Sequence, residues 1–279
     1  MNSIVNATTN LSFLWHYAKF VKRQSQDRTL GFARFIEFNK IIKNNLLSTY
    51  FQPILDLQKN KIIGYEGLNR PPQSPYFPNT ESFYDYIGET NQAFFFEKHC
   101  RNTTLHEYYH QINGQRFYQD KIIFINIHPQ VLVDFEYKSG ETLQVLKQLN
   151  ISPSQVVLEL TEKKAVKDYG MFAKMLENYR SQGFRIAVDD AGSGYNSLKS
   201  VVQLKPEFIK LDKSLIQCIH QCLDKQKMVA LLLDFALQSN TSVIAEGIEQ
   251  QEELNYLKEL GVHYGQGYLL GKPNQKLLV

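Results

Sequence analysis

The feature that most constrains the fold is a series of short β-like segments, each of which ends in an acidic or amide residue. Six of them cover residues 62–68, 122–127, 156–161, 185–190, 208–213 and 242–248. A buried carboxylate without a partner is costly, because it loses its hydration and gains nothing in return. A metal site shared by the ends of several strands accounts for the pattern.

Stretches long enough for a helix precede the later strands. Residues 168–182 come before the strand at 185–190, and residues 215–240 come before the strand at 242–248. Strands that alternate with helices are typical of a parallel sheet.

The first two strands break this rule. Residues 50–57 and 62–68 are joined by residues 58–61 alone, and four residues are too few for a parallel crossover. We therefore expect an antiparallel pair here. With a last strand at 264–270, the count reaches eight, a number that closes an α/β barrel.

Composition limits the class of protein. A chain of 279 residues with 43% hydrophobic content can bury a large core, as one α/β barrel or as two ordinary domains. The net charge of +3 comes from interspersed signs, so no basic stripe indicates a long nucleic acid.

Several sequence features indicate a cytoplasmic protein. Cys100, Cys218 and Cys222 are few and odd in number, as expected of reduced thiols. The richest apolar run, residues 228–237, is too short for a transmembrane segment, and the N-terminus lacks the pattern of a secretory signal.

Residues 1–30 form a predicted helical extension before a domain at 31–279. Its apolar residues at helical spacing are Leu14, Tyr17, Ala18 and Val21. This helix packs on the main domain, or it binds a partner, a second copy or, through Trp15 and Phe20, a membrane surface. A second helical stretch, residues 33–47, leads into the first strand.

Barrel closure would bring the polar strand ends together, because the carboxyl ends of parallel strands meet at one mouth. The residues concerned are Glu66, Asn126, Glu159, Asp189, Asp190, Asp212, Glu246 and Gln266. A dinucleotide-binding fold is excluded, since no glycine-rich turn follows the first strand, and the glycines at 192–194 follow two aspartates that would repel a phosphate.

Carboxylate and amide oxygens without clustered His or Cys select Mg²⁺ or Mn²⁺. Five or more acids exceed what one octahedral ion requires, so two ions are expected, an arrangement suited to in-line phosphoryl displacement. Lys210 would lie on the same strand face as Asp212. It either balances charge or holds a water or a phosphate oxygen.

The segment YFQPILDLQKNKIIGYEGLNR at residues 50–70 resembles the opening of the EAL family of cyclic-di-GMP phosphodiesterases. The Glu-Ala-Leu triplet that names the family corresponds to Glu66-Gly67-Leu68. The resemblance continues, over about residues 31–275, through the segments FINIHP, LELTE, VDDAGSGYNSL, FIKLDKSLI, AEGIE and GQGYLLGKP.

This resemblance implies a modified TIM (β/α)8 barrel with one antiparallel strand, preceded by a short helical segment. It implies hydrolysis of cyclic-di-GMP to linear pGpG by a homodimer with two Mg²⁺ or Mn²⁺ ions. The implied metal ligands are Glu66, Asn126, Glu159, Asp189, Asp190, Asp212 and Glu246, and the implied catalytic residues are Glu66, Lys210 and Glu246. Gln52, Leu68, Arg70 and Gln266 match substrate-binding positions, and Glu162 matches a loop-stabilising glutamate.

Some residues depart from the family pattern. Gly67 replaces the alanine of the triplet, Ala191 stands where phenylalanine is common, Asn196 stands where serine is frequent, and Pro71-Pro72 follow Arg70. The alternatives to an enzyme are a receptor that holds cyclic-di-GMP without cutting it and a scaffold without a nucleotide. Because every implied metal ligand and the implied catalytic lysine, Lys210, are present, the sequence favours the enzyme.

Overall fold

A computed structural model describes residues 29–90, 93–118, 120–127, 140–161, 169–192 and 197–278. The chain divides into two compact units, Met1–Leu47 with Pro71–Tyr86, and Ser48–Arg70 with Ile87–Val279. The predictions for residues 1–28, Glu162 and Asn196 lie outside the described residues.

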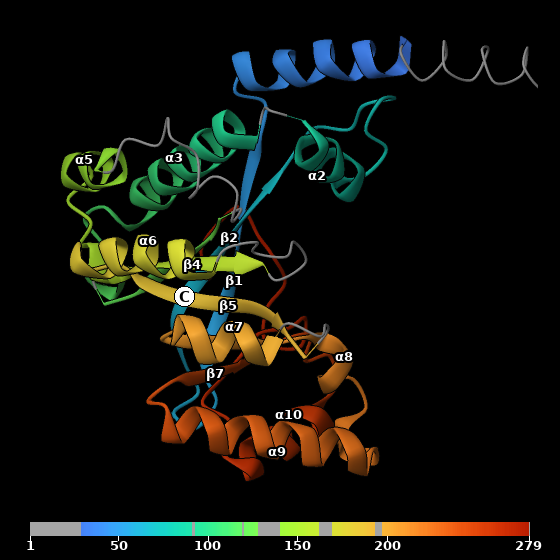
Figure 1. Cartoon of the computed structure of the whole chain (residues 1–279), viewed down its shortest axis with the longest axis vertical. Coiled ribbons are helices and arrows are strands. Elements are labelled where there is room, and N and C mark those ends of the chain that lie inside the picture. The colour runs from blue at the N-terminus through green and yellow to red at the C-terminus, as the bar shows by residue number, and fades with distance from the viewer. Residues whose placement is uncertain are drawn as a thin grey trace, which may run out of the picture. The chain divides into compact units, whose positions relative to one another are not determined.

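The larger unit contains a closed barrel of eight strands in sequence order (Figure 1). The strands are β1 (Ser48–Asp56), β2 (Lys61–Arg70), β3 (Ile122–Ile127), β4 (Val156–Thr161), β5 (Arg185–Ala191), β6 (Phe208–Leu211), β7 (Ser242–Ala245) and β8 (Tyr264–Gly265). β1 pairs antiparallel with both β2 and β8, and all other neighbours are parallel. The predicted modified barrel with one antiparallel strand is confirmed.

Helices lie outside the strands, with α6 and α7 on β5, α9 on β7, and α3 on β2 and β3 (Figure 1). The labelled α-helices are α2 (Thr80–Glu89), α3 (Ala93–Ile112), α5 (Glu141–Gln148), α6 (Tyr169–Ser181), α7 (Ser197–Leu204), α8 (Lys213–Ile216), α9 (Leu223–Gln238) and α10 (Gln251–Leu260). Short 3-10 turns are η1 (Arg116–Tyr118), η2 (Pro153–Gln155) and η3 (Ile219–Gln221). None of these described helices combines the length and apolar character that crossing a lipid bilayer requires.

Several elements differ from the sequence prediction. The strands β6 and β7 end at Leu211 and Ala245, short of the predicted ends at residues 213 and 248. The helical stretch expected over residues 215–240 is divided into α8, η3 and α9, because Cys218 adopts a left-handed backbone conformation with φ of 55°. The last strand stops at Gly265, and the chain then turns, so that Gly271 N–H donates to the Gly267 carbonyl at 3.0 Å.

Side chains inside the barrel form two layers. The apolar layer includes Ile54, Phe124, Val157, Ala187, Phe208 and Ile244, with Tyr264 packed against them. Strand alternation places the residue two positions nearer the mouth on the same inner face. These residues are Gln52, Asn126, Glu159, Asp189, Lys210, Glu246 and Gln266. The polar layer of the site therefore rests on an apolar floor.

The smaller unit is built around a helix over residues 29–43. Phe38 and Ile41 are buried, and the Phe38 ring lies 6.0 Å from the ring of Phe83. The helix was predicted over 33–47, but it ends earlier at a turn in which Asn45 has a φ of 51°.

The structure explains the glycine at position 67. A Cβ there would lie 2.4 Å from the γ-methyl of Thr104 on α3, so the threonine methyl fills the space of an alanine side chain. Thr104 is fully buried, and its hydroxyl accepts a hydrogen bond from Asn69 Nδ2 at 2.9 Å. Its rotamer is thus held in place.

We expect Gly67→Ala to lower the free energy of unfolding by about 1–3 kcal/mol, because the added methyl overpacks this contact. Thr104→Ser keeps the hydroxyl and removes the methyl, so the double variant should be more stable than Gly67→Ala alone. Urea unfolding of the wild type, the two single variants and the double variant measures the coupling energy between positions 67 and 104. Losses of stability that simply add in the double variant would contradict the contact.

His263 gives a test of pH dependence. Its Nδ1 accepts a hydrogen bond from the Val243 N–H at 3.1 Å, and burial lowers the pKa of His263 although Asp56 opposes this. The folded state therefore favours the neutral ring. As the pH falls below about 6.5, the unfolded chain binds a proton that the folded chain does not, and stability decreases.

His263→Asn keeps an acceptor for the Val243 N–H and removes this titration. Urea unfolding at about pH 7 and about pH 5 should show a smaller loss of stability in the variant than in the wild type. Equal losses would mean that His263 contributes nothing to the acid sensitivity.

Candidate active site

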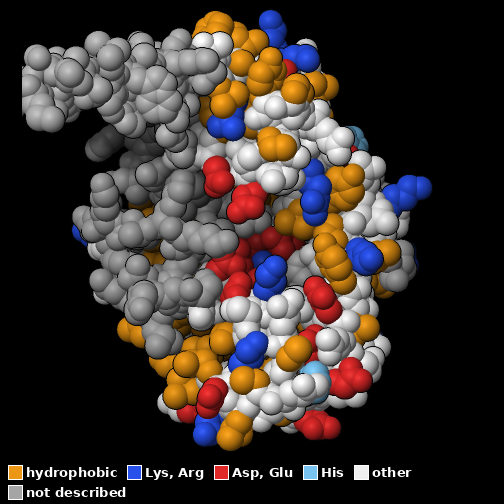
Figure 2. Space-filling model, turned by 90° about the vertical axis from the view of Figure 1, so that its right-hand side faces the viewer, with side chains coloured by type: hydrophobic (Ala, Val, Ile, Leu, Met, Phe, Trp, Pro, Cys, Tyr) orange, Lys and Arg blue, Asp and Glu red, His pale blue; other side chains and the backbone are white. Residues whose placement is uncertain are grey.

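The centre of the polar layer is the ammonium of Lys210. Its Nζ lies 2.7 Å from Glu246, 3.0 Å from Glu159, 3.3 Å from Glu66 and 3.4 Å from Asp189. The Lys210 side chain is only 1% exposed. Figure 2 shows acidic side chains gathered in a hollow of the surface with basic side chains beside them.

Glu66 is held by a network of amide side chains from β3, from β1 and from the residue directly after β8. Its Oε1 accepts from Asn126 Nδ2 at 3.0 Å, and its Oε2 accepts from Gln266 Nε2 at 2.7 Å. Gln266 Nε2 also donates to Gln52 Oε1 at 3.1 Å. Burial by itself raises the pKa of Glu66, but the Lys210 ammonium and these amide donors outweigh it, so the pKa is lowered.

The other carboxylates experience excess negative charge. Burial raises the pKa of Glu246 to about 8, with Lys210 opposing and Asp189 and Glu66 adding to the shift. Burial raises the pKa of Glu159 well above its ordinary value and raises that of Asp189, and Lys210 opposes both shifts. One ammonium thus faces four carboxylates. This excess of negative charge would be offset by additional cations bound at the site.

Unpartnered acceptors support the fit of a divalent ion. Apart from the Lys210 ammonium, the oxygens of Glu159 have no hydrogen-bond partner among the described residues, and neither does Oε1 of Gln266. Such buried oxygens are costly unless a cation or a donor reaches them. Carboxylate and amide oxygens are the donors that Mg²⁺ and Mn²⁺ prefer.

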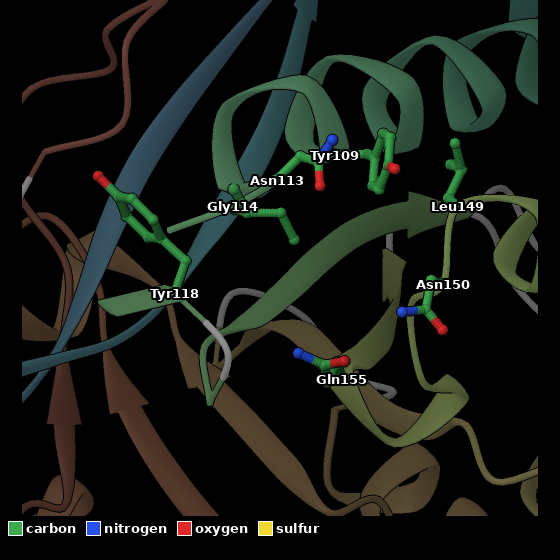
Figure 3. Close-up of a pocket in the computed structure, with 8 residues that line it drawn as sticks. Tyr109, Asn113, Gly114, Tyr118, Leu149, Asn150 and Gln155 are labelled. Carbon is green, nitrogen blue, oxygen red and sulfur yellow. The ribbon is translucent and has the colours of Figure 1, made fainter. Parts of the chain in front are cut away.

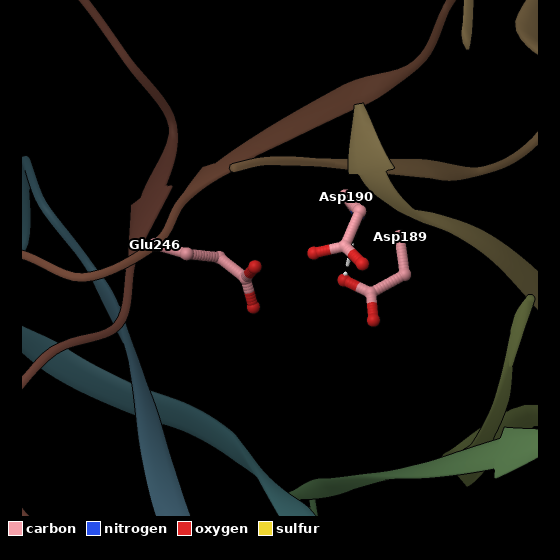
Figure 4. A group of neighbouring side chains, drawn as sticks. All are labelled: Asp189, Asp190 and Glu246. Carbon is pink, nitrogen blue, oxygen red and sulfur yellow. Dashed lines mark hydrogen bonds between the residues drawn. The ribbon is translucent and has the colours of Figure 1, made fainter. Parts of the chain in front are cut away.

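A β-bulge brings two adjacent carboxylates to the same place. The pairing of β5 with β6 gains one extra residue between Val188 and Ala191, and Asp190 has a φ of 55°. In a regular strand Asp189 and Asp190 would point to opposite faces, but a bulge re-aims one of them. Asp189, Asp190 and Glu246 each offer an oxygen within 4.8 Å of the others (Figure 4).

The predicted substrate-binding residues lie around this layer. Gln52 is buried, and its Nε2 donates to the Gly271 carbonyl at 3.1 Å. Leu68 is half-buried and Arg70 is exposed at the carboxyl end of β2. The Arg70 guanidinium lies 5.4 Å from the centre of the Tyr50 ring, which orients it by a cation–π contact.

Two predicted residues have other contacts or lie outside the described residues. Asp212 is the N-cap of α8, and its Oδ1 accepts from the Ser214 N–H at 2.9 Å. It is not in the group formed by Asp189, Asp190 and Glu246. Its role as a ligand stays a prediction, as does the role of Glu162, which the structure does not describe.

Gly267 is a positioning residue that sequence reasoning missed. A Cβ at this position would lie 2.1 Å from the Ile248 carbonyl oxygen and 2.3 Å from its nitrogen. Only glycine lets the two backbones approach so closely, and this contact fixes Gln266 beside Glu66. The sequence signal was the pair of glycines that flanks Gln266.

A cavity of about 200 Å³ lies apart from this site (Figure 3). Its lining residues are Tyr109, Ile112, Asn113, Gly114, Tyr118, Leu149, Asn150 and Gln155. They come from segments that precede β3 and β4, at the end of the barrel opposite the carboxylates. No carboxylate lines the cavity, which makes it a poor candidate for the metal chemistry.

The sequence model of the EAL domain family matches residues 37–273. A probable cyclic di-GMP phosphodiesterase of Escherichia coli, PdeB, is 29% identical over 245 residues, which are 84% of this chain and 44% of that protein. The cyclic di-GMP phosphodiesterase PdeA of Borreliella burgdorferi is 28% identical over 236 residues, 84% of this chain and 34% of that protein. The chain thus spans less than half the length of these relatives.

Solved structures share the fold. A standalone EAL protein from Vibrio cholerae with bound c-di-GMP matches with a TM-score of 0.73 and 29% identity, covering 83% of this chain and 94% of that one. A manganese and cyclic di-GMP complex of BlrP1 from Klebsiella pneumoniae matches with a TM-score of 0.72 and 27% identity, covering 82% and 56%. Together with the family match over most of its residues, these similarities establish that the chain belongs to the EAL domain family.

Proposed function

We propose that this chain is a metal-dependent phosphodiesterase that hydrolyses cyclic di-GMP to linear pGpG. The observation that carries the proposal is the arrangement of four carboxylates within 2.7–3.4 Å of one buried ammonium at the barrel mouth. Relatives named as cyclic di-GMP phosphodiesterases, and neighbours with bound nucleotide, support the same substrate class.

Two groups of side chains would hold two Mg²⁺ or Mn²⁺ ions. Glu66, Asn126, Glu159 and Asp189 form the first group, and Asp189, Asp190 and Glu246 form the second, with Asp212 in support. Asp189 belongs to both groups, which suits a bridging carboxylate. When bound, such ions stabilise the negative charge that develops on the oxygens of the phosphoryl group.

The amide network fixes the carboxylate that names the family. Asn126 and Gln266 hold both oxygens of Glu66, so its rotamer is set before a substrate arrives. Preorganised groups of this kind avoid reorganisation during the reaction. Gln266 thereby acts through Glu66, in addition to its predicted place on the substrate side.

Lys210 and Glu246 supply the charged donor and the acceptor near the reacting water. The Nζ of Lys210 can donate to an attacking water or to a phosphate oxygen. Glu246, whose carboxylate lies 2.7 Å from the Lys210 ammonium, would accept a proton from that water. Arg70, held against the Tyr50 ring, is suited to bind a phosphate oxygen through its planar guanidinium.

A receptor that binds cyclic di-GMP without cutting it is the competing function. No described observation favours it, because the six described acids, Asn126 and Lys210 are all present. A direct assay separates the two functions.

With cyclic di-GMP and MgCl₂ or MnCl₂, we expect the purified chain to form pGpG, detected by chromatography, and EDTA to stop the reaction. Glu66→Ala should reduce the rate at least about 100-fold, because it removes a ligand and the acceptor of two amide donors. Glu259→Ala, an exposed glutamate on the outer helix α10, is the matched control and should retain the wild-type rate.

Tight binding of the nucleotide by the wild type without product would establish a receptor instead. Equal product formation by Glu66→Ala would show that the reaction does not use this site.

We also expect Lys210→Met to lower the free energy of unfolding in EDTA by roughly 3–5 kcal/mol, because three buried carboxylates and the half-buried Glu246 lose their cation. Added MnCl₂ should restore part of this loss. Lys213→Met, an exposed control three residues along the chain, should change stability by no more than about 0.5 kcal/mol. A Lys210 variant that Mn²⁺ does not stabilise would speak against a cation site here.

A further inference from the structure

Glu253 is a buried acid outside the polar layer of the candidate site. It lies in the first turn of α10 and is 1% exposed. A buried carboxylate is costly unless hydrogen-bond donors replace its hydration, and three backbone N–H groups do so here. Oε2 accepts from Glu249 at 2.9 Å and from Gln250 at 3.0 Å, whereas Oε1 accepts from Cys218 at 2.8 Å. Both oxygens of this side chain therefore hold backbone groups in place.

The cap of α10 explains only one of these oxygens. Gln250 is the N-cap residue of α10, and a glutamate at the third helical position commonly accepts from the N-cap N–H. The bond to Cys218 has no part in such a cap, because Cys218 precedes Glu253 by 35 residues and lies directly before η3. Oε1 therefore joins α10 to a second segment of the chain.

The backbone of Cys218 has an unfavourable conformation that this bond stabilises. Its φ of 55° lies in the left-handed region, which residues with a side chain disfavour. Such conformations persist where the surrounding contacts hold them. The bond to Glu253 is one such contact, and the Gln221 N–H donates to the Cys218 carbonyl at 3.0 Å as η3 begins. The turn between α8 and η3 is therefore held by the carboxylate of Glu253.

The two segments that Glu253 joins belong to strands that carry the site. We name residues 211–222 the β6 segment and residues 246–250 the β7 segment. Lys210 lies just before the β6 segment, and Glu246 is the first residue of the β7 segment. Their side chains form the shortest of the four ion pairs of Lys210, at 2.7 Å. The placement of one segment against the other therefore sets the position of Glu246 beside Lys210.

The β6 segment and the β7 segment are linked at three successive places. Next to the strands, the Glu246 N–H donates to the Leu211 carbonyl at 3.1 Å. Further along both segments, a Cβ on Gly247 would lie 2.5 Å from the Cβ of Lys213, so the segments are in close contact there. The third link is the carboxylate of Glu253. A change at Glu253 would release the last of these links.

From these contacts we infer that Glu253 is a positioning residue for the proposed hydrolysis. Its carboxylate holds the β7 segment against the β6 segment, so that Glu246 keeps its place beside Lys210. Glu253 acts through Glu246 and is itself no part of the polar layer. The inference rests on the proposed function and adds a residue to it.

The variant Glu253→Gln separates positioning from helix capping. Its amide oxygen can still accept from Glu249 and Gln250, but its NH₂ group cannot accept from Cys218. We expect the kcat for cyclic di-GMP to fall at least about tenfold and the KM to change less than about twofold, because a displaced Glu246 affects the reacting groups more than substrate binding. The dissociation constant of Mn²⁺, measured by calorimetry on the chain without nucleotide, should rise at least about fivefold.

The matched control is Glu252→Gln, which removes the same charge from an exposed neighbour in the same helical turn and should keep the wild-type values. If circular dichroism shows that Glu253→Gln does not fold, Glu253→Asp replaces it. The aspartate keeps the charge but is one methylene too short to reach Cys218 from α10, so the same losses are expected. Wild-type kcat and wild-type Mn²⁺ affinity in the folded variant would overturn the inference and leave Glu253 as a helix cap.

This inference and the proposed function can fail separately. If the wild type binds Mn²⁺ but forms no pGpG, the proposed function fails, and the calorimetric comparison of Glu253→Gln with Glu252→Gln still decides whether Glu253 positions Glu246. A wild type that neither binds Mn²⁺ nor forms pGpG would overturn both.

Discussion

The arrangement of the site depends on one buried cation. The ammonium of Lys210 contacts Glu66, Glu159, Asp189 and Glu246, which lie on β2, β4 and β5 and directly after β7. The apolar floor below them, including Phe124 and Phe208, excludes water from the barrel interior beneath this layer, which strengthens the interactions between the charges. A single ammonium cannot balance four carboxylates, and this imbalance is the physical reason to expect divalent ions.

The antiparallel first strand has a direct consequence for that layer. β1 places Gln52 opposite Glu66 in the strand register, while β8 brings Gln266 between them. A uniformly parallel barrel would run β1 in the other direction and change which side chain reaches Glu66. The hairpin of β1 and β2 therefore shapes the site as well as closing the sheet.

Much of the fold and of the candidate site could be predicted from the sequence, because strand alternation and the number of strands can be taken from the order of residues. They predicted the β1–β2 hairpin, the eight strands and the meeting of Glu66, Asn126, Glu159, Asp189, Lys210, Glu246 and Gln266. The bulge at Asp189 and Asp190 could not be predicted, since it depends on the register with β6.

Other features depend on contacts between residues far apart in sequence. From the sequence alone, Gly67 indicates a locally weakened strand. In the structure, the methyl group of Thr104 on α3 occupies the space that a Cβ at position 67 would need. The division of residues 215–240 depends on the left-handed backbone of Cys218, a residue type that does not signal a break. The sequence predicted Asp212 as another acidic residue at the barrel mouth. In the structure its carboxylate caps the N-terminus of α8 by accepting a hydrogen bond from the Ser214 N–H.

The central claim is that this layer holds two neighbouring divalent ions, and the most direct measurement is a Mn²⁺ titration followed by electron paramagnetic resonance. The account predicts two ions per chain and a spectrum of magnetically coupled pairs. Changing Asp189, the proposed shared ligand, to Asn should give the spectrum of isolated ions. A wild-type protein that binds no Mn²⁺, or only a single isolated ion, would contradict it.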